Sequence, residues 1–285
     1  MRWRTVARLL PGLGAVAVLF VAGGSSGLAA PAPDTCASEP NPIVCENARP
    51  GNPSSEWDVA GMGDPSIQGF ATDFSVNDGD EVAFKIKTDA LDYRIDIYRM
   101  GYYGGAGARK VATVAPSASL PQLQPSCLTD TSTGLVDCGN WAESARWQVP
   151  PGAVSGIYFA RLVRTDTGGD SHIFFVVRDD DGASDVLFQT SDTTWQAYNR
   201  YGGNSLYVGG PAGRAYKVSY NRPFTTREYA SPSFVWEDEY PMVRWLERNG
   251  YDVSYFSGID TARSGPELLE HRAFLSVGHD EYWSG

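Results

Sequence analysis

Residues 272–285 read Arg272-Ala273-Phe274-Leu275-Ser276-Val277-Gly278-His279-Asp280-Glu281-Tyr282-Trp283-Ser284-Gly285. The apolar run at 273–277 has the length of a buried strand and ends at Gly278, after which polar residues follow that can bind metals or move protons. An extended backbone would point His279 and Glu281 the same way, because alternate residues share one side of a strand. The pattern predicts a strand that leads into an active-site loop. A buried strand followed by a plain polar turn is the alternative.

The preceding hundred residues predict more strands, separated by helices. Residues 238–248 have helical spacing of apolar side chains and end at Asn249-Gly250, a favoured helix stop. A second helix is expected to open at 264–267. Strand-helix-strand order predicts a parallel sheet, whose ligands bind beyond the carboxyl ends of the strands, where His279 and Glu281 lie. Since such domains ordinarily have more strands, we expect residues 183–285 to be an incomplete α/β domain, truncated at the C-terminus. The strands are expected at 185–189, 215–220, 253–256 and 273–277.

Residues 67–180 have a different pattern. Apolar and polar residues alternate at 81–88, where Val82, Phe84 and Ile86 are the apolar positions, and again at 93–99. Short alternating segments without a helical pattern between them predict a β-sandwich of the immunoglobulin-like kind. The polar residues 179–182 form the expected linker to the α/β domain. The other strands of the sandwich are expected at 67–74, 146–149, 156–164 and 172–178.

The N-terminal residues 1–30 have the order of a secretory signal peptide: three arginines, an apolar run at 13–22, then small residues. The run is shorter than the roughly 20 residues that span a bilayer, although a retained N-terminal anchor is the alternative. Either way the pattern predicts an exported protein, secreted or at the cell surface, with no membrane span after signal removal. Residues 31–66 are rich in Pro, Ser, Asn and Gly, and we expect an extended leader there.

The four cysteines agree with export, because disulfides persist in oxidising compartments. Cys36 and Cys45 bracket one short segment, and Cys127 and Cys138 bracket another. Four cysteines allow three connectivities. We favour the two local pairs, since short loops close more readily than long ones.

Charge and motifs exclude several functions. The formal charge is −11, and removal of Arg2, Arg4 and Arg8 with the signal peptide lowers it to −14, so nucleic acid is not an expected partner. After residue 30, neither a G-x-S-x-G elbow nor a G-x-x-x-x-G-K loop is present. All four cysteines precede Gly139, which excludes a thiol nucleophile in the second domain. His279 and Glu281 match the H-x-E of zinc deaminases, but the P-C-x-x-C partner is missing.

Four separated segments resemble one known family. From about residue 60 onward the sequence is similar to the large (beta) subunit of N,N-dimethylformamidase and its relatives. Its expected architecture is therefore α+β and multidomain: the immunoglobulin-like sandwich, followed by an α/β domain like that of class I glutamine amidotransferases. The segments are Ile97-Tyr98-Arg99-Met100-Gly101-Tyr102-Tyr103-Gly104-Gly105, Ser155-Gly156-Ile157-Tyr158-Phe159-Ala160-Arg161-Leu162, Thr194-Trp195-Gln196-Ala197-Tyr198-Asn199 and Gly278-His279-Asp280-Glu281-Tyr282-Trp283.

The resemblance implies a mononuclear Fe(III) centre. Carried over by position, its ligands are Tyr158 from the sandwich, Tyr198 from the loop after the first strand of the second domain, and Glu281. His279 is implied as a catalytic residue that accepts or relays a proton. Phenolate and carboxylate oxygens are hard donors that suit a hard trivalent ion. Each residue also has an ordinary alternative, because tyrosines commonly pack in strands and polar residues commonly follow them.

The sequence thus predicts an exported, iron-dependent amidohydrolase that acts on the C–N bond of a small linear amide. The alternative is a non-catalytic secreted or cell-surface binding protein that keeps the fold. A homo-oligomer or a small partner subunit remains open.

Overall fold

The computed structural model describes residues 35–36, 38–224, 227, 235–278 and 280–283. It has a mixed α+β fold, with strands in several sheets and few helices in this described part. The predicted signal peptide, residues 1–30, and the predicted catalytic residue His279 lie outside the described residues. Among those described, no helix is both long enough and apolar enough to cross a membrane.

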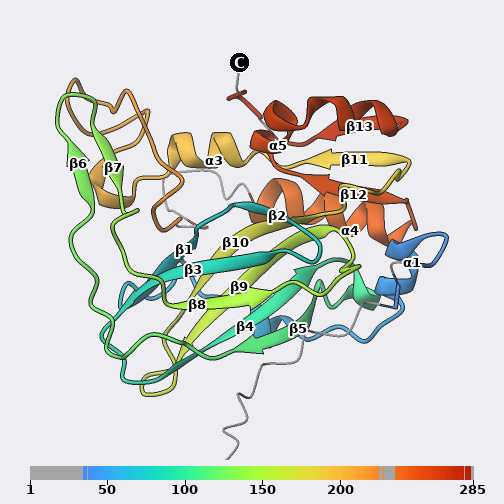
Figure 1. Ribbon diagram of the computed structural model, residues 1–285, viewed down its shortest axis with the longest axis horizontal. Coiled ribbons are helices and arrows are strands. Elements are labelled where there is room, and N and C mark those ends of the chain that lie inside the picture. Colours follow the sequence, from blue (N-terminus) through green and yellow to red (C-terminus); the bar gives the residue numbers. More distant parts are fainter. Residues whose placement is uncertain (1–34, 37, 225–226, 228–234, 279, 284–285) are drawn as a thin grey trace, which may run out of the picture.

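Two sheets of mostly antiparallel strands face each other around a shared core, which includes Phe84, Ile97, Tyr158 and Phe175 (Figure 1). We call it the sheet core. Strand β3 shows why these residues form strands, because its alternate side chains are buried while their neighbours are exposed or half-buried. The first sheet has the order β1 (Ile67–Ala71), β3 (Glu81–Thr88), β8 (Ala145–Gln148); the second has the order β2 (Ser75–Asn77), β10 (Asp170–Arg178), β9 (Gly156–Arg164), β4 (Tyr93–Met100), β5 (Ala108–Val114).

Strands β9 and β10 are buried on both faces. On one face, Tyr158 and Phe175 belong to the sheet core. On the other, Phe159 and Phe174 belong to a second cluster, which also holds side chains from residues 36–57 and 186–255. We call this cluster the junction core. Because it contains residues from both sides of the predicted linker at 179–182, the two predicted domains share a core.

The second unit contains a three-stranded parallel sheet, as its strand-helix-strand order predicts. Its order is β12 (Val253–Phe256), β11 (Val186–Gln189), β13 (Ala273–Ser276). Strand β12 lies nearest to the larger sheet and contacts β9 and β10, whereas β13 is the far edge (Figure 1). The carboxyl ends of all three strands therefore meet along one edge of this sheet.

The helices of the second unit partly follow the predicted ones. The expected helix at 238–248 is present as the π-helical turn η3 (Val235–Glu239) and α4 (Tyr240–Arg248). An α-helix begins earlier than 264–267, because Ser257 before it and Asp260 in its first turn form a capping box. At 264–267 the structure has only a 3₁₀ helix. These elements are α3 (Asp192–Tyr198), η2 (Tyr201–Gly203), α5 (Gly258–Arg263) and η4 (Gly265–Glu270).

The predicted strand at 215–220 is wrong. Its backbone bonds go to loops instead of a sheet: Ala215 N–H donates to Ser205 O at 2.7 Å, and Tyr216 N–H donates to Thr133 O at 2.7 Å. These residues lie against the hairpin of β6 (Leu128–Asp130) and β7 (Leu135–Asp137). Residues 215–220 therefore contact the hairpin without forming a strand of their own.

Both predicted disulfides, Cys36–Cys45 and Cys127–Cys138, are present. The first lies in the leader at 31–66, a segment that was expected to be extended. In the structure this segment contains the helices α1 (Pro42–Asn47) and α2 (Ser54–Trp57), and the side chain of Trp57 is buried in the junction core. The short 3₁₀ turn η1 (Tyr103–Gly105) contacts α1. The leader is thus an integral part of the fold.

Candidate functional site

At the carboxyl edge of the parallel sheet, the side chain of Asp280 links the ends of two strands through hydrogen bonds. Its Oδ2 accepts from Gln189 Nε2 at 2.6 Å, at the end of β11, and from Ser276 Oγ at 2.8 Å, at the end of β13. Partial burial raises the pKa of this carboxyl. Asp280 therefore fixes the start of the segment that carries Glu281 across the strand ends.

Three tyrosines surround Glu281 at this edge. Tyr198 OH donates to Glu281 Oε2 at 2.9 Å, and Tyr207 OH donates to Glu281 Oε1 at 2.9 Å. The hydroxyls of Tyr207 and Tyr282 lie 2.7 Å apart. The rings of Tyr198 and Tyr207 stack, with centroids 4.1 Å apart. We call these four residues the Tyr–Glu cluster, in which both oxygens of one carboxylate carry a phenol.

Two phenols of the cluster, those of Tyr198 and Tyr207, have raised pKa values. Loss of hydration raises the pKa of Tyr198, and the hydrogen bond to the Glu281 carboxylate raises it further. Loss of hydration and the bonds to Tyr198, Tyr282 and Glu281 also raise the pKa of Tyr207. At neutral pH both tyrosines are therefore donors, and only a strong Lewis acid could displace their protons.

The donor set of Tyr198, Tyr207 and Glu281 suits a hard cation. Two phenol oxygens and one carboxylate lie within hydrogen-bond distance of each other, and all are hard donors. In the described part of the chain, no three His, Cys, Asp or Glu side chains are grouped so that they could hold a metal ion. A metal site among these residues would therefore depend on tyrosine.

The structure brings together two of the predicted site residues, Tyr198 and Glu281, although Tyr198 lies at the end of helix α3 and not in a loop. It places the predicted ligand Tyr158 elsewhere. The Tyr158 hydroxyl donates to Val154 O at 2.8 Å, and its ring packs on Trp147 and Phe175 in the sheet core. Its direction follows from β9, in which alternate residues face opposite cores. His279 lies outside the described residues.

Of the two tyrosines that donate to Glu281, Tyr207 is the one that was not predicted from the sequence. It belongs to an irregular Gly-rich segment with no apolar periodicity, nine residues after Tyr198. Its side chain is 40% exposed. The available signal in the sequence was a large aromatic residue that continues no apolar pattern.

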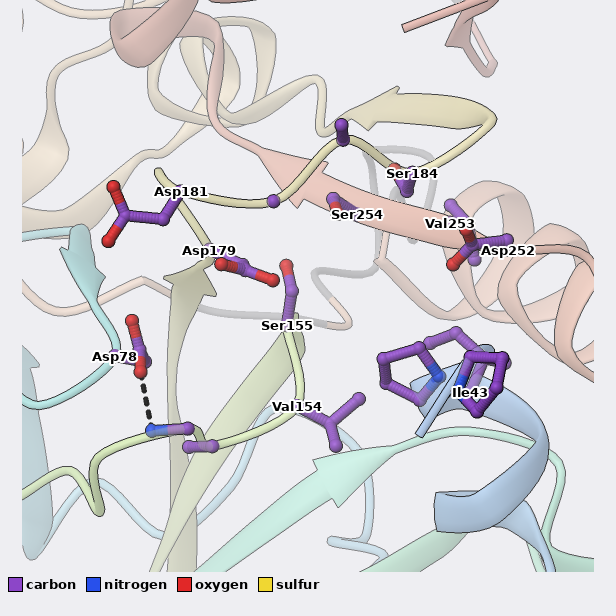
Figure 2. A pocket seen from close by; sticks show the side chains of 16 residues that line it. Ile43, Asp78, Val154, Ser155, Asp179, Asp181, Ser184, Asp252, Val253 and Ser254 are labelled. Carbon is purple, nitrogen blue, oxygen red and sulfur yellow. Dashed lines mark hydrogen bonds between the residues drawn. The ribbon is translucent and has the colours of Figure 1, made fainter. Parts of the chain in front are cut away.

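A separate cavity of about 410 Å³ lies where the leader, the linker and the two units meet. Four carboxylates line it, from Asp78, Asp179, Asp181 and Asp252, and Figure 2 shows them around the opening. Burial raises the pKa of both Asp179 and Asp252. No member of the Tyr–Glu cluster lines this cavity, so the cluster is a surface site at the strand ends.

Comparison with known proteins identifies a family. No curated protein matches the sequence. Among solved structures, domain 1 of VCBP3 from Branchiostoma floridae is 12% identical and covers 41% of this chain and 97% of its own, with a TM-score of 0.24. The cellulose-active LPMO CelS2 in complex with copper is 16% identical and covers 37% of this chain and 52% of its own, with a TM-score of 0.23. Neither TM-score establishes a shared fold. Residues 94–285, however, match one family over more than half of the chain, and the chain therefore belongs to the family described as N,N-dimethylformamidase beta subunit-like, C-terminal.

Proposed function

We propose that this chain is an exported N,N-dimethylformamidase-like amidohydrolase, and that Tyr198, Tyr207 and Glu281 would hold its mononuclear ferric ion. The observation that carries the proposal is the pair of phenols on the two oxygens of Glu281, both 2.9 Å away. Tyr207 replaces Tyr158 in the set that the resemblance implied, because Tyr158 donates to Val154 O inside the sheet core. Family membership supports the same chemistry.

The finer fold assignment belongs to the same proposal. We propose that the two facing sheets form an immunoglobulin-like sandwich and that the parallel sheet belongs to a class I glutamine amidotransferase-like domain. Two disulfides are compatible with an extracellular protein. We propose secretion or display at the cell surface, directed by residues 1–30.

In the proposed reaction, each residue has a defined task. When bound, a ferric ion supplies the Lewis acidity that polarises the amide carbonyl. To hold the ion, Tyr198 and Tyr207 would give up their protons to solvent and serve as anionic oxygen donors, and Glu281 would add a third negative charge. Asp280 fixes the backbone next to Glu281 through its bonds to both strand ends. His279 would accept the proton of the attacking water and return it to the leaving amine.

The test uses the full natural protein, expressed with its signal peptide and purified without chelators. Iron content, visible absorption and hydrolysis of N,N-dimethylformamide, followed by release of dimethylamine, are measured together. About one iron per chain, a phenolate-to-iron absorption band and turnover would support the proposal. A protein with full iron loading and no visible band would contradict the tyrosine ligands. A protein that binds no iron and hydrolyses no small amide would favour the non-catalytic binding protein.

A further inference from the structure

Helix α3 contacts the Glu281 segment at two levels. At its last residue, the Tyr198 hydroxyl bonds the Glu281 carboxylate. One turn earlier, Thr194 Oγ1 accepts the backbone N–H of Glu281 at 2.9 Å and that of Tyr282 at 3.2 Å. Residues four apart lie on the same face of a helix. One helical face therefore holds both the backbone and the side chain of Glu281.

The surroundings of Thr194 explain why its two hydrogen bonds hold the backbone of Glu281 and Tyr282 in place. Thr194 is fully buried, and residues 280–283 belong to no helix or strand, so these backbone donors have no partner in a regular ladder. A single hydroxyl oxygen, Thr194 Oγ1, accepts both backbone N–H groups. Its neighbour Thr193 donates from Oγ1 to the carbonyl of Tyr282. Both hydrogen bonds are partly shielded from water, so this hydroxyl favours one path of the chain.

The position of the Glu281 carboxylate depends on that path. A glutamate side chain has several rotatable bonds, and its two oxygens meet two different tyrosines, each at 2.9 Å. Tyr198 is carried by the same helix as Thr194, whereas Tyr207 comes from the irregular segment after η2. A shift of the Glu281 backbone would therefore separate the carboxylate from at least one phenol.

We propose that Thr194 is a positioning residue of the Tyr–Glu cluster, which sets the backbone of Glu281 so that its carboxylate reaches Tyr198 and Tyr207 together. The part of this inference that concerns metal binding rests on the proposed function. The part that concerns the path of residues 281–282 does not. The two parts are separable by experiment.

The decisive variants are Thr194→Val and Thr194→Ser. Valine keeps the shape and the β-branch and removes the accepting oxygen, whereas serine keeps the oxygen and removes the methyl group. Hydrogen exchange of the Glu281 and Tyr282 amides is measured on the iron-free full-length protein. We expect exchange at these two amides to be on the order of 10-fold faster in Thr194→Val, and close to wild type in Thr194→Ser. Thr194→Ala, which raises helix propensity, provides the same comparison if the valine variant does not fold.

Iron affinity is then measured on the same proteins by competition with a chelator. A residue that only orients a ligand typically contributes about 10- to 100-fold, so Thr194→Val should weaken iron binding by that factor and Thr194→Ser should restore it. Unchanged amide protection in Thr194→Val would overturn the proposal, as would faster exchange with unchanged iron affinity. If the wild type binds no iron, the proposed function fails, and the exchange result alone decides whether Thr194 anchors Glu281.

Discussion

Two glutamates in this molecule each accept several hydrogen bonds, but one lies buried in an ion pair and the other is exposed. Glu247 is completely buried and makes an ion pair with the equally buried Arg99, 2.9 Å away. Arg99 donates to both of its carboxylate oxygens, and Tyr255 OH and Asn47 Nδ2 add two further bonds. Glu281 is exposed, accepts from two phenols, and has no arginine or lysine partner within the described residues.

The difference separates a structural carboxylate from one with capacity for a ligand. Around Glu247 the charge is balanced and the donors come from the leader, the larger sheet and β12, so the group fixes three parts of the chain. The other N–H groups of the Arg99 guanidinium also have partners, because they donate to the carbonyls of Val154, Met100 and Ser155. Around Glu281 the two donors are neutral phenols, and no arginine or lysine among the described residues pairs with the carboxylate.

The largest expected effect is at the buried pair. Arg99→Met leaves the Glu247 charge without a partner in the junction, and we expect a loss of about 3–5 kcal/mol in the free energy of unfolding. Urea unfolding of wild type and variant measures it.

Two controls sharpen that result. Arg94→Ala removes a partly exposed cation from the pair with Asp96 and should cost no more than about 1 kcal/mol. The double variant Arg99→Met with Glu247→Leu should recover much of the loss, since no unpaired charge remains. A loss below about 1 kcal/mol for Arg99→Met would show that the junction tolerates an isolated carboxylate, and the contrast with Glu281 would disappear.

His172 provides a test of the same junction by pH. Burial among aromatic rings lowers its pKa to about 4, against the contribution of its bond to Trp57 O. The unfolded value is about 6.5, so as the pH falls from about 6.5 to about 4 the unfolded chain binds a proton that the folded chain refuses. Stability should therefore fall over this window, by roughly 1.4 kcal/mol per pH unit and on the order of 3 kcal/mol at pH 4.

His172→Gln is the control, because the amide can donate to Trp57 O but does not titrate. Urea unfolding of both proteins at pH 7, 6, 5 and 4 gives the comparison. The difference in stability between them should change steadily in favour of the variant as the pH falls. Parallel pH profiles would mean that His172 is not buried in its neutral form.

Much of the fold follows from periodicity alone. Strands β3, β9 and β12 occupy the predicted residues, because alternating or continuous apolar runs bounded by turn residues are strong local signals. The strand-end position of Glu281 follows for the same reason. The helices of the leader could not be predicted, since they are short and are stabilised by burial of residues such as Trp57 in a core formed by distant segments.

The candidate site was only partly predictable. Which of two neighbouring residues in β9 faces a given core depends on the sheet register, and a strand that is buried on both faces has no polar side to reveal it. Tyr158 and Phe159 are therefore equivalent in the sequence and opposite in the structure. Tyr207 is brought to Glu281 by an irregular segment, for which no periodic signal exists.

Metal binding tests the second half of the comparison. Tyr207→Phe removes one oxygen from the cluster and almost no packing, because the ring stays free to stack on Tyr198. We expect iron affinity to fall by about 10- to 100-fold and the visible absorption to weaken, with little change in stability. Metal analysis and absorption spectra of the full-length protein measure both. Unchanged affinity and spectrum would remove Tyr207 from the proposed ligands.

Tyr158→Phe is the matched variant with the smallest expected effect, and it decides between the two ligand sets. The same single oxygen is removed, but here it is a buried donor to Val154 O in the sheet core. We expect a loss of about 1 kcal/mol in the free energy of unfolding, because the carbonyl keeps only the longer bond from Arg99 Nε at 3.3 Å, and no change in iron content or absorption. If instead Tyr158→Phe lost iron while Tyr207→Phe kept it, the ligand set implied by the family resemblance would be right. The Tyr–Glu cluster would then be a hydrogen-bonded surface feature, and β9 would have to turn Tyr158 out of the sheet core in the metal-bound protein.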